Sequence, residues 1–195
     1  MTNNFLPLNS VLIIISLTTN HPAESLPTDP DWAGRTVLRD VRVVDAPVPA
    51  DDLFWAFARV GGDVGYYTMD WAWHLRGVAD RLLGGVGLRR GRRHPTSIRV
   101  GDAIDFWRVA EVEPGRRLLL RAEMLVPGEA FLEWSIDPEE RELRQTATFF
   151  PRGLWGRVYW WVLVPAHALI FGRMARRVVA TAAGRAAGKP PVTVL

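Results

Sequence analysis

The chain has 195 residues, the length of a single domain with short tails. Hydrophobic residues make up 48% of it and charged residues 23%, a globular balance that excludes wholesale disorder. The chain contains no cysteine. A disulfide scaffold, a cysteine-ligated zinc or iron–sulfur site and a thiol nucleophile are therefore excluded.

The charge is distributed unevenly along the chain. The formal total is +3, but residues 1–142 carry a net −5, whereas residues 143–195 carry a net +8 and no acidic residue. A basic, apolar C-terminal quarter on a mildly acidic body suits an anionic partner. Alternatively, these arginines pair with acidic residues on the protein's own surface, where such pairs add little stability. Both interpretations stay open.

Residues 1–34 differ in composition from the rest and are predicted to form a flexible N-terminal extension. The apolar run 11–17 lies among Asn, Thr and Pro residues, and the first basic residue is Arg35. A secretory signal begins with a basic region, and a bilayer span needs about 20 apolar residues. A signal or anchor, or an added edge strand, are the alternatives.

The next elements are a strand and two short helices. Residues 36–46 alternate apolar and polar side chains and are closed by Pro47 and Pro49, which predicts a strand. The sequence Ala50-Asp51-Asp52 opens a helix that ends at Gly61-Gly62, because acids favour a helix start. Residues 69–83 carry apolar residues at helical spacing and predict a second helix.

Four extended runs and a long helix complete the chain. The runs cover residues 97–112, 116–126, 130–136 and 142–150, with Gly101-Asp102 as a potential break in the first. Their short connections predict an antiparallel meander. Residues 154–183 predict a long helix that Pro165 should kink or split near Val164. The expected fold class is α+β, with the terminal helix on the concave face of one sheet.

The sequence lacks the motifs of nucleotide, metal and covalent-catalysis sites. The Gly- and Arg-rich stretch 84–93 has neither the spacing nor the strand-to-helix context of a dinucleotide fingerprint; its arginines suit a solvated loop or an anion site. No serine lies in a Gly-x-Ser-x-Gly elbow. The histidines His21, His74, His94 and His167 are scattered. We therefore expect no cofactor, no metal ion and no nucleic-acid partner.

A series of short motifs, in order along residues 35–183, resembles a bacterial family. They include Trp73-x-Leu75-Arg76-Gly77-x-x-Asp80, Gly101-Asp102-x-x-Asp105-Phe106-Trp107-Arg108-Val109, Arg121-Ala122-Glu123-Met124, Gln145-Thr146-Ala147-x-Phe149-x-Pro151-Arg152-Gly153-Leu154 and Pro165-x-His167. The sequence resembles domain-of-unknown-function family 2867 (DUF2867), which looks like part of the helix-grip superfamily of START, birch-pollen-allergen and polyketide-cyclase proteins (SRPBCC). The resemblance implies a curved antiparallel sheet around a long C-terminal helix, with an apolar cavity between them.

The resemblance transfers no catalytic residues, and it implies that an NAD(P)-binding half, present in some relatives, is missing here. Such a protein supplied separately is one expected partner. The domain itself is expected over residues 35–187, with a tail over 188–195.

We predict that the cavity binds a hydrophobic or aromatic small molecule. Apolar side chains would form the walls and polar ones the anchors. The expected ligand-binding residues are Trp73, Arg76, Trp107, Arg108, Glu123, Met124, Gln145, Tyr159, Trp160 and His167.

Two other functions stay open. The first is a cyclase, dehydratase or isomerase that uses His74 or His167 with Asp80 or Glu123 for proton transfer. The second is a peripheral membrane protein whose aromatic and arginine-rich terminal helix faces anionic lipid. The expected location is the cytoplasm, with or without attachment to a membrane surface.

Overall fold

The computed structural model describes residues 15–16, 37–67, 78, 82, 92–94, 97–137, 139 and 141–188. Most of the second predicted short helix and of the stretch 84–93 lies outside the described residues. The predicted site residues Trp73 and Arg76 lie outside them as well, as do His74 and Asp80.

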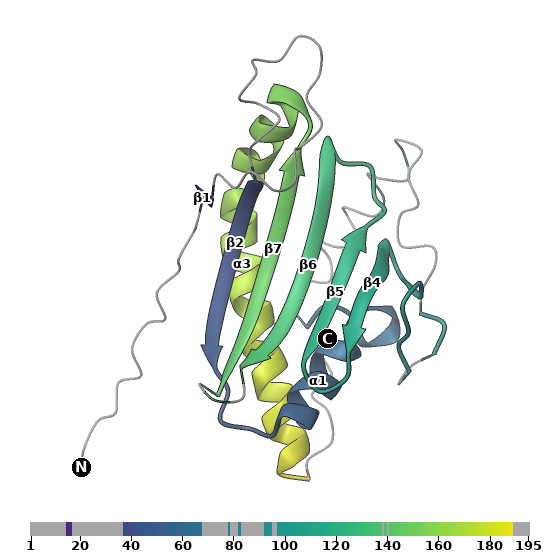
Figure 1. Ribbon diagram of the computed structural model, residues 1–195, viewed down its shortest axis with the longest axis vertical. Helices are drawn as coiled ribbons and strands as arrows, with labels where there is room; N and C mark the ends of the chain where they lie inside the picture. Colours follow the sequence, from purple (N-terminus) through teal and green to yellow (C-terminus); the bar gives the residue numbers. More distant parts are fainter. Residues whose placement is uncertain are drawn as a thin grey trace, which may run out of the picture.

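The described strands form one sheet in which every neighbouring pair is antiparallel (Figure 1). Its order is β1-β2-β7-β6-β5-β4-β3. Strands β4 to β7 form the predicted meander, and β2 pairs with β7, the last strand in the sequence. The strands are β1 (Ile15–Ser16), β2 (Val37–Asp45), β3 (Ala103–Ile104), β4 (Trp107–Glu113), β5 (Arg117–Ala122), β6 (Gly128–Asp137) and β7 (Glu142–Pro151).

Alternating burial along the strands defines the face of the sheet that carries the core. In β7, residues Leu143, Gln145, Ala147 and Phe149 are buried, whereas the residues between them are half-buried or exposed. Successive side chains of a strand point to opposite faces, so one face is covered and the other faces solvent. The predicted α+β class and meander are confirmed.

The first extended run has two breaks: the expected turn at Gly101-Asp102, where Gly101 has a φ of 86°, and a second one at Asp105-Phe106 between β3 and β4. Asp105 has a φ of 53°, which is unusual for a residue with a side chain. Its carboxylate accepts hydrogen bonds from the Tyr66 hydroxyl at 2.9 Å and from the Gly62 amide at 3.1 Å. These contacts hold the turn between β3 and β4 against the segment that follows α1.

Helix α1 (Ala50–Ala58) begins after Pro49 and carries Asp51 and Asp52 in its first turn, as predicted. It is followed by the 3-10 turn η2 (Gly62–Val64). Gly61 precedes η2 with a φ of 86°, and a Cβ there would lie 2.3 Å from Cγ2 of Ile104. Glycine is therefore required where this segment crosses the edge of the sheet.

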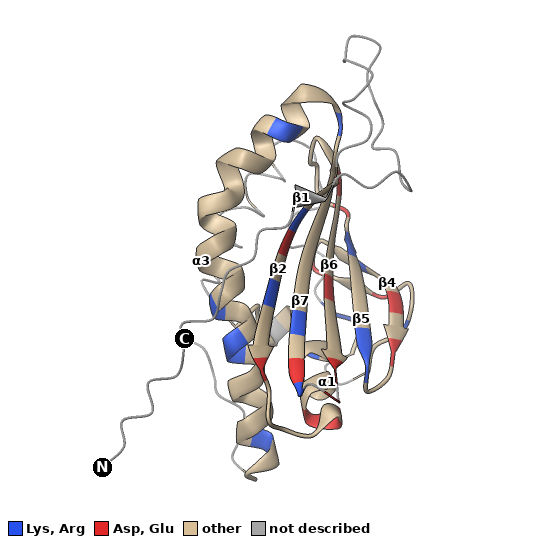
Figure 2. Ribbon diagram, turned by 60° about the vertical axis from the view of Figure 1, so that its left-hand side comes forward, with Lys and Arg blue, Asp and Glu red and all other residues tan. Residues whose placement is uncertain are grey.

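Helix α3 (Gly153–Ala186) runs without interruption across the covered face of the sheet (Figures 1 and 2). Pro165 does not split it. Because Pro165 is exposed, water can replace the backbone hydrogen bond that proline removes. The start of α3 packs closely on the sheet, since a Cβ on Gly156 would lie 2.4 Å from the Pro127 carbonyl oxygen.

Helix α1 lies beside α3 at one end of the sheet (Figure 1), and the larger core cluster lies between these helices and the strands. There the rings of Phe57 and Trp134 stack with their centroids 6.0 Å apart. Met174, Val178 and Ala182 of α3 are fully buried against this cluster. A smaller cluster, formed by Leu38, Phe149 and Trp160, lies toward the start of α3.

Candidate functional site

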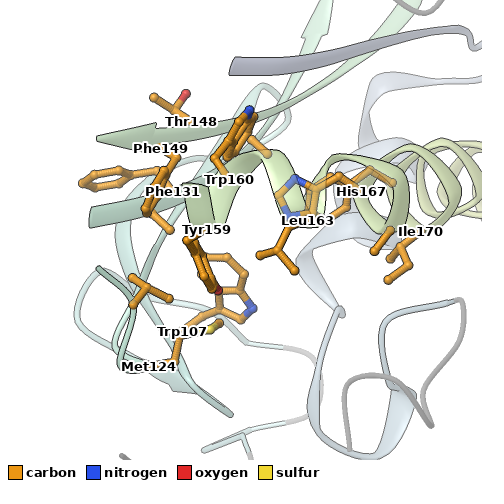
Figure 3. A pocket seen from close by; sticks show the side chains of 15 residues that line it. Trp107, Met124, Phe131, Thr148, Phe149, Tyr159, Trp160, Leu163, His167 and Ile170 are labelled. Atoms are coloured by element: carbon orange, nitrogen blue, oxygen red, sulfur yellow. The ribbon is translucent and has the colours of Figure 1, made fainter. Parts of the chain in front are cut away.

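A cavity of about 230 Å³ lies between the sheet and the N-terminal half of α3 (Figure 3). Strands β4, β6 and β7, the segment after β5, and α3 between Tyr159 and Phe171 contribute to it. Its lining residues are Trp107, Met124, Val126, Ala130, Phe131, Ala147, Thr148, Phe149, Tyr159, Trp160, Leu163, Ala166, His167, Ile170 and Phe171. Thr148 and Phe131 alternate with inward-facing neighbours, so their side chains belong to the other face of the sheet.

Aromatic rings fix one wall of the cavity. Trp160 stacks on Phe149 with centroids 5.8 Å apart and an interplanar angle of 6°. The His167 ring meets Trp160 edge-on at 5.0 Å and lies 4.7 Å from the Phe171 ring. These contacts position the imidazole from α3 beside an otherwise apolar space.

Two polar atoms of the lining residues are buried without a hydrogen-bond partner among the described residues. They are Nε1 of Trp107, on β4, and Nδ1 of His167, on α3. Most buried polar groups in proteins are paired, and an unpaired one costs free energy. A bound molecule with a hydrogen-bond acceptor would therefore gain from contact with Trp107.

The imidazole of His167 is neutral near pH 7. Burial lowers its pKa to about 4, because the charged form loses its hydration inside the protein. The buried carboxylate of Asp40 raises the pKa and the Arg42 guanidinium lowers it, both by less than burial does. At neutral pH the ring therefore offers one donor and one acceptor rather than a positive charge.

Asp40 and Arg42 form a buried ion pair on β2, at 4% and 5% exposure. Nη2 of Arg42 donates to Oδ2 of Asp40 at 2.9 Å; Nε and Oδ1 lie 2.6 Å apart, an ionic contact without good hydrogen-bond geometry. The pair faces Ala147 and Gln145 across the ladder. Removing two charges from water is costly, and this cost offsets much of the attraction between them, so the pair adds little to the stability of the fold. The two charges of this pair act on the His167 imidazole in opposite directions.

Five of the predicted site residues line this cavity: Trp107, Met124, Tyr159, Trp160 and His167. Arg108 and Glu123 do not. They lie on the opposite face of the sheet, where the guanidinium binds the carboxylate through two hydrogen bonds of 2.9 and 3.1 Å. Each lies next to a lining residue in the extended chain, Arg108 to Trp107 and Glu123 to Met124, so the two predicted polar anchors point away from the cavity.

Gln145 is buried but also lies outside the lining. Its Oε1 accepts a hydrogen bond from Nε1 of Trp134 at 2.9 Å, and its Nε2 donates to the Phe171 carbonyl oxygen at 3.4 Å. The side chain thus joins the sheet to α3 at one end of the cavity. This geometry gives it a structural role.

The sequence analysis missed Phe149, Leu163 and Ile170 as lining residues and Asp40 and Arg42 as buried charges. A signal for the charges was present, because Leu38, Asp40 and Arg42 share one face of an alternating strand. For Leu163 and Ile170, helical spacing from Tyr159 and His167 places them on the same side of α3. The spacing could not show which side of α3 faces the sheet.

No group of three or more histidine, aspartate or glutamate residues in the described part of the chain is arranged to hold a metal ion. Among the cavity-lining residues, His167 and Tyr159 are the ionisable ones. The cavity is thus mostly apolar, with few polar groups in its walls.

Comparison with known proteins gives a family but no function. The model of the family described as "Protein of unknown function (DUF2867)" matches residues 32–174. No curated protein matches the chain.

Several solved structures are similar at low identity. The Zhui aromatase/cyclase from Streptomyces sp. R1128 is 16% identical, with a TM-score of 0.43 over 79% of this chain and 99% of that one. CalU16 from Micromonospora echinospora is 10% identical, with a TM-score of 0.42 over 93% and 98%. DynU16, from the dynemicin biosynthetic locus, is 22% identical, with a TM-score of 0.40 over 78% of this chain and 48% of its own. At such TM-scores these structures carry no argument about the site.

Proposed function

The chain belongs to the DUF2867 family of proteins of unknown function, and we propose that it binds a small, largely apolar molecule between the sheet and α3. The cavity beneath the N-terminal half of α3 carries the proposal. Nearly all of its inward-facing side chains are apolar or aromatic, and two buried polar atoms of its walls have no partner in the described part of the chain. A mostly apolar hollow with few polar groups is the usual form of a small-molecule site.

The size of the cavity limits the ligand. Its volume of about 230 Å³ lies just below the range of roughly 300–1,000 Å³ common for ligand pockets. A molecule of one or two fused rings fits this space better than a large polycycle. Burying about 300 Å² of such a molecule supplies about 7 kcal/mol before the costs of association. Dissociation constants in the micromolar to millimolar range are expected.

Naphthalene and 2-naphthol are suitable probes because their fluorescence responds to transfer from water into an apolar site. We expect saturable binding of both to the full chain. Ala147→Leu and Ala130→Leu each add a side chain to the lining and should abolish it. Ala180→Leu makes the same change at an exposed position of α3 outside the lining and should leave binding intact. Absence of saturable binding, or equal binding by all three variants, refutes the proposal.

The unpaired Trp107 donor provides a finer test. Trp107→Phe keeps an aromatic wall but removes the Nε1–H group. We expect it to weaken 2-naphthol binding by about threefold to tenfold, the range of one net hydrogen bond. Naphthalene, which has no acceptor, should bind both proteins alike. Equal losses for the two probes would show that Trp107 acts through shape alone.

The hypothesis of a cyclase, dehydratase or isomerase stays a prediction. It needs two proton-transfer groups that converge on the cavity. His167 lies there, but Glu123 is paired with Arg108 on the other face of the sheet. His74 and Asp80 lie outside the described residues. A separate NAD(P)-binding partner and a cytoplasmic location likewise stay predictions.

A further inference from the structure

The side of α3 that faces away from the sheet is apolar over its first five turns. We call these exposed residues the outer apolar face: Leu154, Trp155, Val158, Trp161, Val162 and Leu169. Trp155 is 77% exposed and Val162 70%. Their spacing places most of them in one stripe along the helix. An exposed stripe with two tryptophans marks a surface that contacts something other than water.

Arginines continue the same side of the helix. Arg173 follows Trp155 by about five full helical turns, so it points in the same direction. Arg173, Arg176 and Arg177 are exposed, and none forms an ion pair with another described residue. Helix α3 carries no acidic residue, as Figure 2 shows. Arg185, farther along, is bound to Asp52 and is not part of this surface.

We propose that this side of α3 rests on an anionic lipid bilayer, with Trp155 and Trp161 in the interface and Arg173 and Arg177 at the lipid phosphates. Tryptophan is favoured at the boundary of headgroups and acyl chains, and arginine binds phosphate. The proposal is independent of what fills the cavity.

A bilayer suits this surface better than a second copy of the chain. In a symmetric contact the same face would meet itself. Because α3 contains no acid, the arginines of both copies would stay unneutralised by the facing helix. Anionic headgroups supply the missing negative charge, and the acyl boundary accepts the apolar side chains.

Contact along the bilayer surface, rather than a span, follows from the packing of α3. By length and composition this helix could cross a membrane, and 22% of its most apolar window is buried. Its inner side, however, packs on the sheet through Trp160, Phe171 and Met174. To cross the bilayer, α3 would have to leave the sheet, and the free energy gained by burying these side chains in the core would be lost.

Sedimentation with vesicles tests the proposal on the full chain. We expect binding to phosphatidylcholine vesicles that contain one-third phosphatidylglycerol, weak binding to pure phosphatidylcholine, and loss of binding in half-molar NaCl. Arg173→Gln with Arg177→Gln should weaken binding by about fivefold for each charge removed. The matched control, Arg116→Gln with Arg144→Gln, removes two exposed arginines from the sheet and should have a smaller effect.

Trp155→Ser with Trp161→Ser tests the apolar contribution. Both side chains are more than half exposed, so the fold should persist, which circular dichroism checks. We expect this variant to bind the anionic vesicles at least about tenfold more weakly. Indifference of the wild type to vesicles, or unchanged binding by this variant, overturns the proposal. Concentration-dependent dimerisation that the same substitutions abolish, without vesicle binding, assigns the face to a second copy instead.

Discussion

The two halves of α3 cover the same sheet, but more side chains are buried in the C-terminal half than in the N-terminal half. In the C-terminal half, Met174, Val178 and Ala182 are fully buried, and α1 packs beside them. In the N-terminal half, Trp160 is the large buried residue, and a cavity separates much of the helix from the strands. Where a second helix completes the layer the core is filled; where the described elements supply none, space remains for a ligand.

The contrast also separates stability from function. Burial of apolar surface and close packing stabilise a fold. The C-terminal half therefore contributes most to the stability of this interface, while the N-terminal half carries the neutral histidine and the outer apolar face. Substitutions in the two halves should differ accordingly.

The largest effect is expected at Met174. Met174→Ala removes a fully buried side chain from the filled half and should lower the free energy of unfolding by about 2–5 kcal/mol. Denaturant titration measures this. A loss below about 1 kcal/mol would mean that this half relaxes around the vacancy as loosely as the half that contains the cavity.

Gln145 lies at the boundary between the halves. Gln145→Leu leaves Nε1 of the fully buried Trp134 without its acceptor and should cost about 1–3 kcal/mol of unfolding free energy. Arg144→Gln, at the exposed neighbouring position, should change stability by less than about 0.5 kcal/mol. Equal effects would show that the hydrogen bond contributes nothing.

Acid should destabilise the protein partly through His167. Its pKa is about 4 in the folded chain and near 6.5 when unfolded, so the unfolded state binds more protons between these values. The contribution is fully present above pH 6.5 and is lost as the pH falls toward 4. From pH 7 to pH 5 the loss should be about 2 kcal/mol.

Denaturant titrations at the two pH values, on wild type and His167→Phe, measure this contribution. The variant should lose about 2 kcal/mol less than wild type over the interval. Identical pH dependence in His167→Phe and wild type would contradict the buried, neutral state of His167.

The smallest effect is expected at Leu163. This half-buried side chain lines the cavity, so part of its surface already lacks packing partners. Leu163→Ala should cost less than about 1 kcal/mol of unfolding free energy, far less than Met174→Ala. It should also admit probes larger than 2-naphthol. A loss as large as that at Met174 would show that the N-terminal half is packed as tightly.

Much of the fold could be predicted because its signals are local. Alternation over residues 36–46 gave β2, and Asp51 and Asp52 marked the start of α1. Helical periodicity predicted α3; of the kink or split expected at Pro165, the split does not occur, since the helix continues past the exposed proline.

The site was harder to predict. Trp107, Met124, Tyr159 and Trp160, predicted as walls, and His167, predicted as a polar anchor, all line the cavity. Arg108 and Glu123 were placed in the cavity but lie outside it, paired with each other.

Local periodicity and short connections therefore determined most of the described strands and helices, the antiparallel meander of β4 to β7 and the apolar, basic character of α3. Periodicity separated the two faces of each strand but did not say which one α3 covers. Only the tertiary structure decided that Asp40 and Arg42 point inward, that Arg108 and Glu123 point outward, and that a cavity remains beside His167. The reason is physical: the curvature of a sheet and the seat of its covering helix depend on contacts between residues far apart in the chain, which no short window of sequence contains.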